Sequence, residues 1–301
     1  MMGEKGCLLE IPLTRKSIKY IPDIVYAQVT EMGCSNRVLK MDILFPSTKE
    51  LLPAVVFITG GRFIYAHKES FLQLRMAVAE AGFVTASIEY RTAPTVRFPQ
   101  PLEDVKAAIR YLRHFAGRFH IDGSNIGIMG ESAGGYLSAL AGVTMDRAEF
   151  EKGEYLSDSS RVNAVVDLYG LSDLTQIGED FSMERQSSYH SAGAAEALWV
   201  NGIAAFGGKD GGICVDASAA AAANPLSYVD ASAPPFLLMH GTKDTMVSSS
   251  QTRKLHEALL RQGNDSTYYL VENACHGGTY WIQPEIVRLI LVFLSIHLKH
   301  A

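Results

Sequence analysis

The stretch that decides the fold is "NIGIMGESAGGYL", residues 125–137. Its first five residues form an apolar run without alternation, which is typical of a strand buried on both faces. From Ala133 onward the composition turns to alanine, glycine and leucine and predicts a helix. Gly-Glu-Ser-Ala-Gly lies at the junction, in the strand–turn–helix context that a nucleophile elbow requires. We therefore predict a sharp turn that presents the hydroxyl of Ser132.

Gly130 and Gly134 have a steric role in this prediction. A sharp turn forces the serine into an unfavourable backbone conformation and brings its neighbours close together, where a Cβ would clash. The helix that starts at the turn offers unpaired N–H groups to developing negative charge. The alternative is a serine that caps an ordinary helix between two packing glycines.

The pattern on either side of this stretch predicts an α/β fold. Apolar runs rich in β-branched residues alternate with helical segments, which indicates a mostly parallel central sheet with flanking helices. The predicted strands are 39–45, 54–59, 84–89, 125–129, 164–169, 236–240 and 267–271. The predicted helices are about 70–81, 101–115, 133–144, 249–262 and 284–297.

One segment breaks this rhythm. Residues 171–229 are rich in serine, glycine and alanine and contain no clear strand. We predict that they form a lid or cap inserted into a single domain, residues 1–301. The alternative is a plain surface excursion.

Composition excludes several classes of protein. The 301 residues are 48% hydrophobic and 20% charged, with a net charge of -5, as in ordinary globular proteins and unlike nucleic-acid binders. The most apolar segment, residues 286–298, is too short to span a bilayer and contains Arg288 and His297. The amino-terminal residues do not resemble a signal peptide, so we expect a cytoplasmic protein. No feature of the sequence determines an oligomeric state.

The four cysteines, Cys7, Cys34, Cys214 and Cys275, show neither paired nor metal-binding spacing. We expect free thiols and neither a metal nor another cofactor. Cys275 immediately precedes a histidine, but no activating cation is visible nearby. We therefore expect it to be a buried spectator rather than a nucleophile.

A serine nucleophile needs a base and a group that orients the base. His276 follows an apolar strand and precedes the last helix, so it lies in a loop at the carboxyl end of the sheet. Asp244 lies in a turn at the same end and would hold the tautomer of His276. Asp173 is the reserve candidate, and Asp244 would otherwise cap the next helix. The order Ser132, Asp244, His276 is that of the α/β-hydrolases.

Two short segments predict an oxyanion hole. One N–H group should come from Ala133, the residue after the nucleophile. The glycine-bearing loop after the strand "AVVFIT" should supply the other, from Gly61 or Arg62. A tight turn without a catalytic role is the alternative.

Candidate substrate contacts are less sharply defined. The aromatic residues of the predicted lid and of the last loop would suit a substrate pocket, and His190 in the lid would also reach the substrate. Such residues can equally pack against the body of the domain. We predict that Phe63, Glu131, Trp199, Phe206 and Trp281 contact substrate, with Tyr189 as a further possibility.

Taken together, five motifs resemble a known family. They are "ITGGRF", "SIEYRTAPTVRFPQPLEDVKAAIRYLR", "GIMGESAGGYL", "HGTKDTMV" and "CHGG". The set resembles the serine carboxylesterases of the α/β-hydrolase fold, near the hormone-sensitive-lipase-like and bacterial acetyl- and feruloyl-esterase branches. The resemblance covers about residues 35–300 and implies hydrolysis of small-molecule esters through an acyl-enzyme, without a cofactor.

The sequence departs from this family in one loop. The family's usual His-Gly-Gly-Gly is Thr59, Gly60, Gly61 and Arg62 here, which puts a long cationic side chain beside the oxyanion hole. In the "YRTAP…FPQPLED" segment, the resemblance implies a structural ion pair between Arg91 and Asp104.

We therefore expect a serine carboxylesterase for acetyl or hydroxycinnamoyl esters. An amide or formamide hydrolase is one alternative. A non-catalytic protein that binds a small molecule on the same fold is another.

Overall fold

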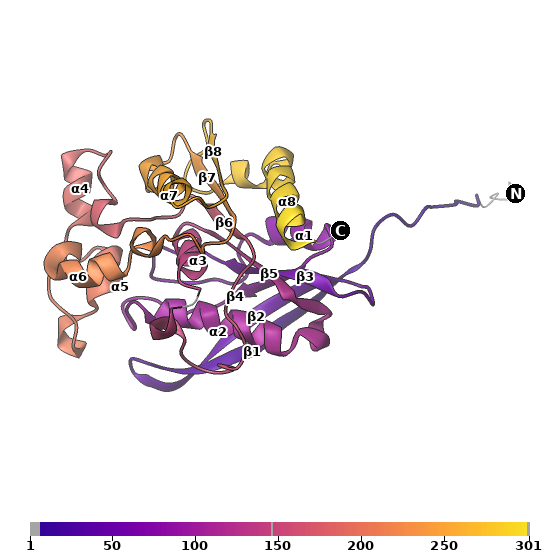
Figure 1. Ribbon diagram of the computed structural model, residues 1–301, viewed down its shortest axis with the longest axis horizontal. Coiled ribbons are helices and arrows are strands. Elements are labelled where there is room, and N and C mark those ends of the chain that lie inside the picture. Colours follow the sequence, from indigo (N-terminus) through magenta and orange to yellow (C-terminus); the bar gives the residue numbers. More distant parts are fainter. Residues whose placement is uncertain (1–6, 146, 300–301) are drawn as a thin grey trace, which may run out of the picture.

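A single eight-stranded sheet forms the centre of the molecule (Figure 1). The computed structural model describes residues 7–145 and 147–299. The strand order is β1-β2-β4-β3-β5-β6-β7-β8; the pairs β1–β2 and β2–β4 are antiparallel, and the other neighbouring pairs are parallel. The bounds are β1 Ile18–Glu31, β2 Cys34–Pro46, β3 Leu52–Ile58, β4 Val84–Ile88, β5 Ile121–Glu131, β6 Val165–Leu168, β7 Phe236–Gly241 and β8 Ser266–Val271.

All seven predicted strands are confirmed, and one strand was missed. β1 forms a long antiparallel hairpin with β2, and its pairing register shifts between Ile21 and Ile24. Pro22 and Asp23 lie at this irregularity, and Asp23 has a φ of 56°. A proline and a bulge interrupt the alternation that identifies an edge strand, which explains why the pattern did not predict it.

Helices cover both faces of the sheet and create two separate cores. α1 (Leu72–Glu80) and α8 (Pro284–Leu298) contribute to one core. α2 (Gln100–His114), α3 (Ala133–Val143) and α7 (Ser249–Arg261) contribute to the other. The five predicted helices are therefore confirmed.

The central strands are buried on both faces, as their unalternating sequence predicted. Every residue of β3 is buried. Val55 and Phe57 belong to the core on the side of α1 and α8, whereas Val56 and Ile58 belong to the opposite core. Successive side chains of a strand point to opposite faces, so each face of β3 contacts its own helices.

Segment 171–229 folds into short helices. These are α4 (Met183–Tyr189), α5 (Ala195–Asn201) and α6 (Ala217–Ala222), with no strand among these described residues. Figure 1 shows the three helices gathered at one end of the molecule.

A buried ion pair fixes the segment after β4. The Nη2 of Arg91 lies 2.7 Å from Oδ1 of Asp104, and its Nε lies 2.9 Å from Oδ2. Both residues are buried, with exposed fractions of 6% and 2%. The ion pair predicted between them is therefore present.

None of the helices formed by residues 7–145 and 147–299 is both long enough and apolar enough to cross a membrane.

Candidate active site

The turn between β5 and α3 is strained at one residue. Ser132 has a φ of 55° and a ψ of -123°, outside the regions that a non-glycine residue normally adopts. A Cβ on Gly134 would lie 2.0 Å from the carbonyl oxygen of Ile58, and one on Gly130 would lie 2.2 Å from that of Gly134. The glycines are therefore required on steric grounds, as predicted, and strain of this kind clusters at functional sites.

A continuous chain of hydrogen bonds joins the three predicted residues. The Oγ of Ser132 lies 2.8 Å from Nε2 of His276, and Nδ1 of His276 lies 2.7 Å from Oδ2 of Asp244. A carboxylate can only accept, so Nδ1 carries the proton and Nε2 accepts from the serine hydroxyl. These residues follow β5, β7 and β8, whose carboxyl ends meet at one edge of the sheet.

The carboxylate of Asp244 is held by several donors. Its Oδ1 accepts the N–H groups of Met246 at 2.8 Å and of Val247 at 2.9 Å. Burial opposes the charge, but hydrogen bonds from His240 and His276 outweigh it and hold the pKa of Asp244 well below its usual range. Asp244 is therefore ionised throughout the neutral range, which suits a group that orients a histidine.

His240 was predicted to pack or hydrogen-bond locally, and it also contacts Asp244. Its side chain is completely buried, and Nε2 lies 3.2 Å from Oδ2 of Asp244 and 3.0 Å from the carbonyl oxygen of Val247. Both neighbours accept, so Nε2 carries the proton, and Nδ1 accepts the hydroxyl of Thr252 at 2.7 Å. No local spacing signals this contact, because His240 lies in strand β7 and Asp244 in the loop that follows it.

Two aromatic rings support His276 from behind. The ring of Tyr169, in the turn after β6, lies 4.9 Å from that of His276 and 4.5 Å from that of Trp281. Trp281 is fully buried and donates its indole N–H to the carbonyl oxygen of Cys275 at 3.0 Å. Trp281 thus packs behind the histidine loop rather than presenting a surface to substrate.

The cysteines are free, as predicted, but one lies in a different environment than expected. Cys275 is exposed, so the prediction of a buried spectator is wrong. Its backbone is used in the loop, where it forms a bridge with Gly277 and accepts from Trp281. These backbone contacts leave the thiol on the outside.

The three N–H groups predicted for the oxyanion hole donate no hydrogen bond to the described part of the chain. Among the contacts of the described residues, none uses the N–H of Gly61, Arg62 or Ala133. Ala133 is the first residue of α3, where helical N–H groups have no partner within the helix. The N–H of Ala133, the residue after Ser132, is therefore free for a ligand at the nucleophile, whereas a role of Gly61 and Arg62 in the same hole stays a prediction.

Glu131 holds the glycine loop in place. The N–H of Gly60 donates to its Oε1, which links the loop after β3 to the nucleophile turn. Burial raises the pKa of Glu131 to about 7, although the Gly60 N–H and the charge of His276 act in the opposite direction. The structure thus places Glu131 in loop support rather than in contact with an open pocket.

The other predicted substrate contacts are scattered. Phe63 and Trp199 are buried, and their ring centroids lie 4.7 Å apart. The indole N–H of Trp199 donates to the hydroxyl of Tyr136 at 3.2 Å, so this cluster is internal packing. Phe206 is 67% exposed and lines a separate surface hollow with Arg97. The structure therefore does not bring these three residues together with Ser132.

The remaining candidates have local roles. Asp173 accepts the N–H of Thr175 at 3.0 Å and the amide of Asn224 at 2.9 Å, so it stabilises the start of segment 171–229 instead of orienting His276. His190 is exposed, which agrees with the surface alternative. Among the residues the structure describes, no group of three or more His, Cys, Asp or Glu side chains could hold a metal ion.

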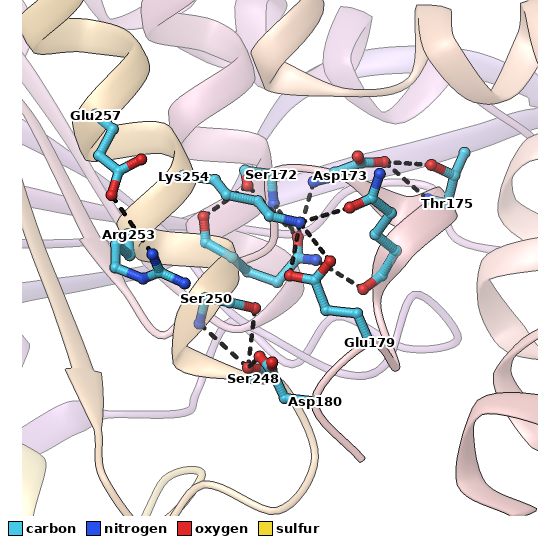
Figure 2. A network of polar contacts seen from close by, with 12 residues as sticks. Ser172, Asp173, Thr175, Glu179, Asp180, Ser248, Ser250, Arg253, Lys254 and Glu257 are labelled. Atoms are coloured by element: carbon cyan, nitrogen blue, oxygen red, sulfur yellow. Dashed lines mark hydrogen bonds and ion pairs between the residues drawn. The ribbon is translucent and has the colours of Figure 1, made fainter. Parts of the chain in front are cut away.

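Polar contacts fasten the start of segment 171–229 to α7. Figure 2 shows Lys254 facing Glu179, with 2.6 Å between Nζ and the carboxylate, and Asp180 facing Ser248. Ser248 caps α7 and lies four residues after Asp244. The hydroxyl of Tyr189 in α4 also donates to the carbonyl oxygen of Met246, at 2.5 Å. The segment is thereby tied to the loop that carries Asp244.

Comparisons with known proteins agree with this geometry. The BD-FAE family model matches residues 41–259. The esterase LipC of Mycobacterium tuberculosis (strain ATCC 25618 / H37Rv) is 31% identical over 75% of this chain and 53% of its own length. An isoprenylcysteine alpha-carbonyl methylesterase of Arabidopsis thaliana is 26% identical over 81% of this chain and 55% of its own. The chain thus spans about half the length of these curated relatives.

Solved structures show the same architecture over almost the whole chain. A truncated carbohydrate esterase from gut microbiota has a TM-score of 0.80 and 27% identity, covering 95% of this chain and 98% of that one. Esterase 2 of Thermogutta terrifontis with bound butyrate has a TM-score of 0.71 at 24% identity, covering 95% and 96% of the two chains, and shares the fold. With its family model matched over most of its length, this chain belongs to the BD-FAE family and has the α/β-hydrolase fold.

Proposed function

We propose that this chain is a serine carboxylesterase that hydrolyses small esters through an acyl-enzyme, with acetyl or hydroxycinnamoyl as the acyl group. The observation that carries the proposal is the unbroken chain from Ser132 through His276 to Asp244 at a strained turn. The names of the relatives, which are esterases, support the same reaction.

In the first half of the reaction, His276 Nε2 takes the hydroxyl proton as Oγ of Ser132 attacks the ester carbonyl. The carbonyl oxygen becomes an oxyanion, which accepts from the N–H groups of Ala133 and Gly61, and from Arg62. When the carbon–oxygen bond to the alcohol breaks, His276 returns its proton to the departing oxygen. The products are a free alcohol and an acyl group on Ser132.

In the second half, water replaces the alcohol. His276 takes one proton from the water while its oxygen attacks the acyl carbon, and the same N–H groups stabilise the second oxyanion. Collapse releases the carboxylic acid, and the proton on His276 returns to Oγ of Ser132. The enzyme is regenerated without a redox step.

Segment 171–229 acts in this proposal as a cap of the single domain. The segment is attached to α7 and to Met246, which lies in the loop that carries Asp244. These attachments support a position of the segment over the site. We place the protein in a reducing compartment such as the cytoplasm, because its four cysteines are free.

Esters and amides are distinguished by a matched pair of substrates. We expect hydrolysis of p-nitrophenyl acetate and no measurable turnover of p-nitroacetanilide, which has the same acyl group and a nitrogen leaving group. Rates are normalised to the uncatalysed reactions, because the two substrates differ in intrinsic reactivity. Comparable normalised rates would instead support the amide hydrolase, and absence of both activities would support the non-catalytic binding protein.

His240 is proposed as a positioning residue for Asp244. In His240→Leu the carboxylate loses a donor, and we expect kcat to fall by about 10²-fold with little change in KM. His240→Gln keeps an N–H near the position of Nε2, and we expect it to retain most of the activity. A carboxylate with fewer donors pairs more strongly with protonated His276, so the acid limb of kcat/KM in His240→Leu should move to higher pH.

Thermal melting of both His240 variants separates positioning from folding. A purely structural role would lower stability in both variants and leave the pH profile of the surviving activity unchanged. That result would remove His240 from the mechanism.

A further inference from the structure

Two polar residues beside the triad have no part in the mechanism proposed above. Glu131 ends β5 directly before Ser132, and Tyr169 follows the last residue of β6. The two strands keep them close, because Glu131 pairs with Leu168 and the N–H of Ser132 donates to the carbonyl oxygen of Leu168 at 2.9 Å. Both residues therefore belong to the same corner of the sheet as the nucleophile.

The backbone of Tyr169 is strained. Its φ of 44° lies in the left-handed region, which is uncommon for a residue with a bulky side chain. Its N–H donates to the carbonyl oxygen of Met239 in β7 at 2.7 Å, which fixes the turn. In this conformation the ring of Tyr169 lies 4.9 Å from that of His276, with 65° between the ring planes. Strain of this kind clusters at functional sites, and here it places the ring against the proposed base.

The hydroxyl of Tyr169 is buried, and among the described residues it forms no hydrogen bond of ordinary length and angle. A buried hydroxyl without a partner costs about 1–3 kcal/mol. Burial raises the pKa of Tyr169 well above its usual range, and the carboxyl of Glu131 acts in the same direction through its charge and through hydrogen bonding. This carboxyl therefore lies within reach of the hydroxyl. A hydrogen bond that is long in a free enzyme can tighten in the complex with substrate.

The same carboxyl already accepts from the loop after β3. The N–H of Gly60 donates to Oε1 of Glu131, and a Cβ on Gly60 would lie 2.7 Å from both carboxylate oxygens. The carboxyl thus packs directly against the backbone of this loop. Gly61 and Arg62, the predicted oxyanion donors, follow Gly60 in the sequence. A carboxylate has about four lone-pair sites, so Glu131 can accept from Gly60 and from Tyr169 at the same time.

We infer that Glu131 and Tyr169 act as one positioning unit, in which the hydroxyl of Tyr169 donates to the carboxyl of Glu131. Through its ring, Tyr169 keeps His276 within reach of Ser132. Through its second hydrogen bond, Glu131 holds the Gly60 loop in the matching position. The inference rests on the proposed esterase function, and it adds that one shared contact aligns the base with the oxyanion loop.

Single variants test this unit with p-nitrophenyl acetate as the substrate. Tyr169→Phe keeps the ring and removes the hydroxyl, and we expect kcat to fall about tenfold with little change in KM. Glu131→Leu removes the acceptor of both donors, and we expect kcat to fall about 10²-fold. Glu131→Gln keeps an amide oxygen as an acceptor and should retain more than about a third of the wild-type kcat.

The double variant, Glu131→Leu with Tyr169→Phe, shows whether the two residues act together. Without the carboxyl the hydroxyl has no acceptor, so the double variant should be no slower than Glu131→Leu alone. Independent contributions would instead multiply, and kcat would fall about 10³-fold. That result would overturn the inference, and so would an unchanged kcat in Tyr169→Phe.

Tyr155→Phe is the matched control. Tyr155 also has a positive φ, of 54°, and its ring lies 4.6 Å from that of His114. Its other ring contacts are with Tyr111 and Phe115, and none of these residues belongs to the triad. Tyr155→Phe should therefore keep the wild-type kcat, whereas a loss equal to that of Tyr169→Phe would show that the effect is not specific to the site.

Folding is separated from positioning by titration of the reactive serine with a fluorophosphonate. If Glu131 and Tyr169 only stabilise the fold, their variants melt at lower temperature but keep the wild-type kcat per reactive serine, and the inference fails. If Glu131→Leu does not fold, the change of kcat per reactive serine in Tyr169→Phe decides. A wild type that neither hydrolyses p-nitrophenyl acetate nor reacts with the probe would instead refute the proposed esterase function itself.

Discussion

Ser132→Ala should abolish ester hydrolysis, with kcat falling by about 10³–10⁶-fold. In the proposed mechanism the substitution removes the atom that forms the covalent bond, whereas the turn, the free N–H groups and His276 remain in place. The small residual rate expected over the uncatalysed reaction would come from these oxyanion donors. Initial rates on p-nitrophenyl acetate, at matched protein concentration, measure the loss.

The control for this variant lies on the same strand. Ser124→Ala makes the same change at an exposed position near the amino-terminal end of β5, and it should leave activity unchanged. A fluorophosphonate probe should label the wild type and Ser124→Ala but not Ser132→Ala. Loss of less than about tenfold in Ser132→Ala, or equal labelling of all three proteins, would show that another residue is the nucleophile.

Asp104→Ala should destabilise the fold by about 3–5 kcal/mol, because it leaves the buried guanidinium of Arg91 without its carboxylate. The Arg91 side chain also donates to the carbonyl oxygens of Thr30 and Gln100, so it cannot easily turn to solvent. Urea denaturation and thermal melting measure the free energy of unfolding.

The same substitution should reduce activity, because residues next to Arg91 hold the glycine loop. The hydroxyl of Tyr90 donates to the carbonyl oxygen of Thr59 at 2.8 Å, and the N–H of Ala93 donates to that of Phe63 at 2.8 Å. A displaced Arg91 segment would therefore move the oxyanion donors.

Two further variants make the result specific. Glu103 lies 3.9 Å from the same guanidinium but is not hydrogen-bonded to it, so Glu103→Ala should cost less than about 1 kcal/mol. A double variant, Arg91→Met with Asp104→Leu, should be more stable than Asp104→Ala, because no unpaired charge stays buried. Unchanged stability and activity in Asp104→Ala would refute a structural role for the pair.

Much of the fold could be predicted from local patterns along the chain. Strand β5, the turn at Ser132 and helix α3 follow one another directly in the sequence. The composition of this one stretch is therefore enough to predict a strained turn. The edge strand β1 was missed because Pro22 and a register shift interrupt its alternation. A pairing partner in β2, rather than the sequence of β1 alone, stabilises it as a strand.

Side-chain environments were harder to predict than elements. Trp199 and Trp281 were expected to contact substrate, but both are fully buried against other rings. An aromatic side chain suits a core and a pocket equally well, so its type does not reveal which one it occupies. Cys275 was expected to be buried, but its thiol is exposed. The backbone of its loop makes the contacts, including the bond from Trp281, and the side chain stays on the outside.

The sequence by itself predicted Ser132, Asp244 and His276 and their order, because parallel strands bring the loops at their carboxyl ends to one edge. Only the tertiary structure decided what surrounds them: the contact of His240 with Asp244, the support of the glycine loop by Glu131, and the bond from Tyr189 to Met246. Glu131 and Tyr189 contact partners that lie many residues away in the sequence. Such contacts depend on how separate segments pack, and no local periodicity or spacing encodes that packing.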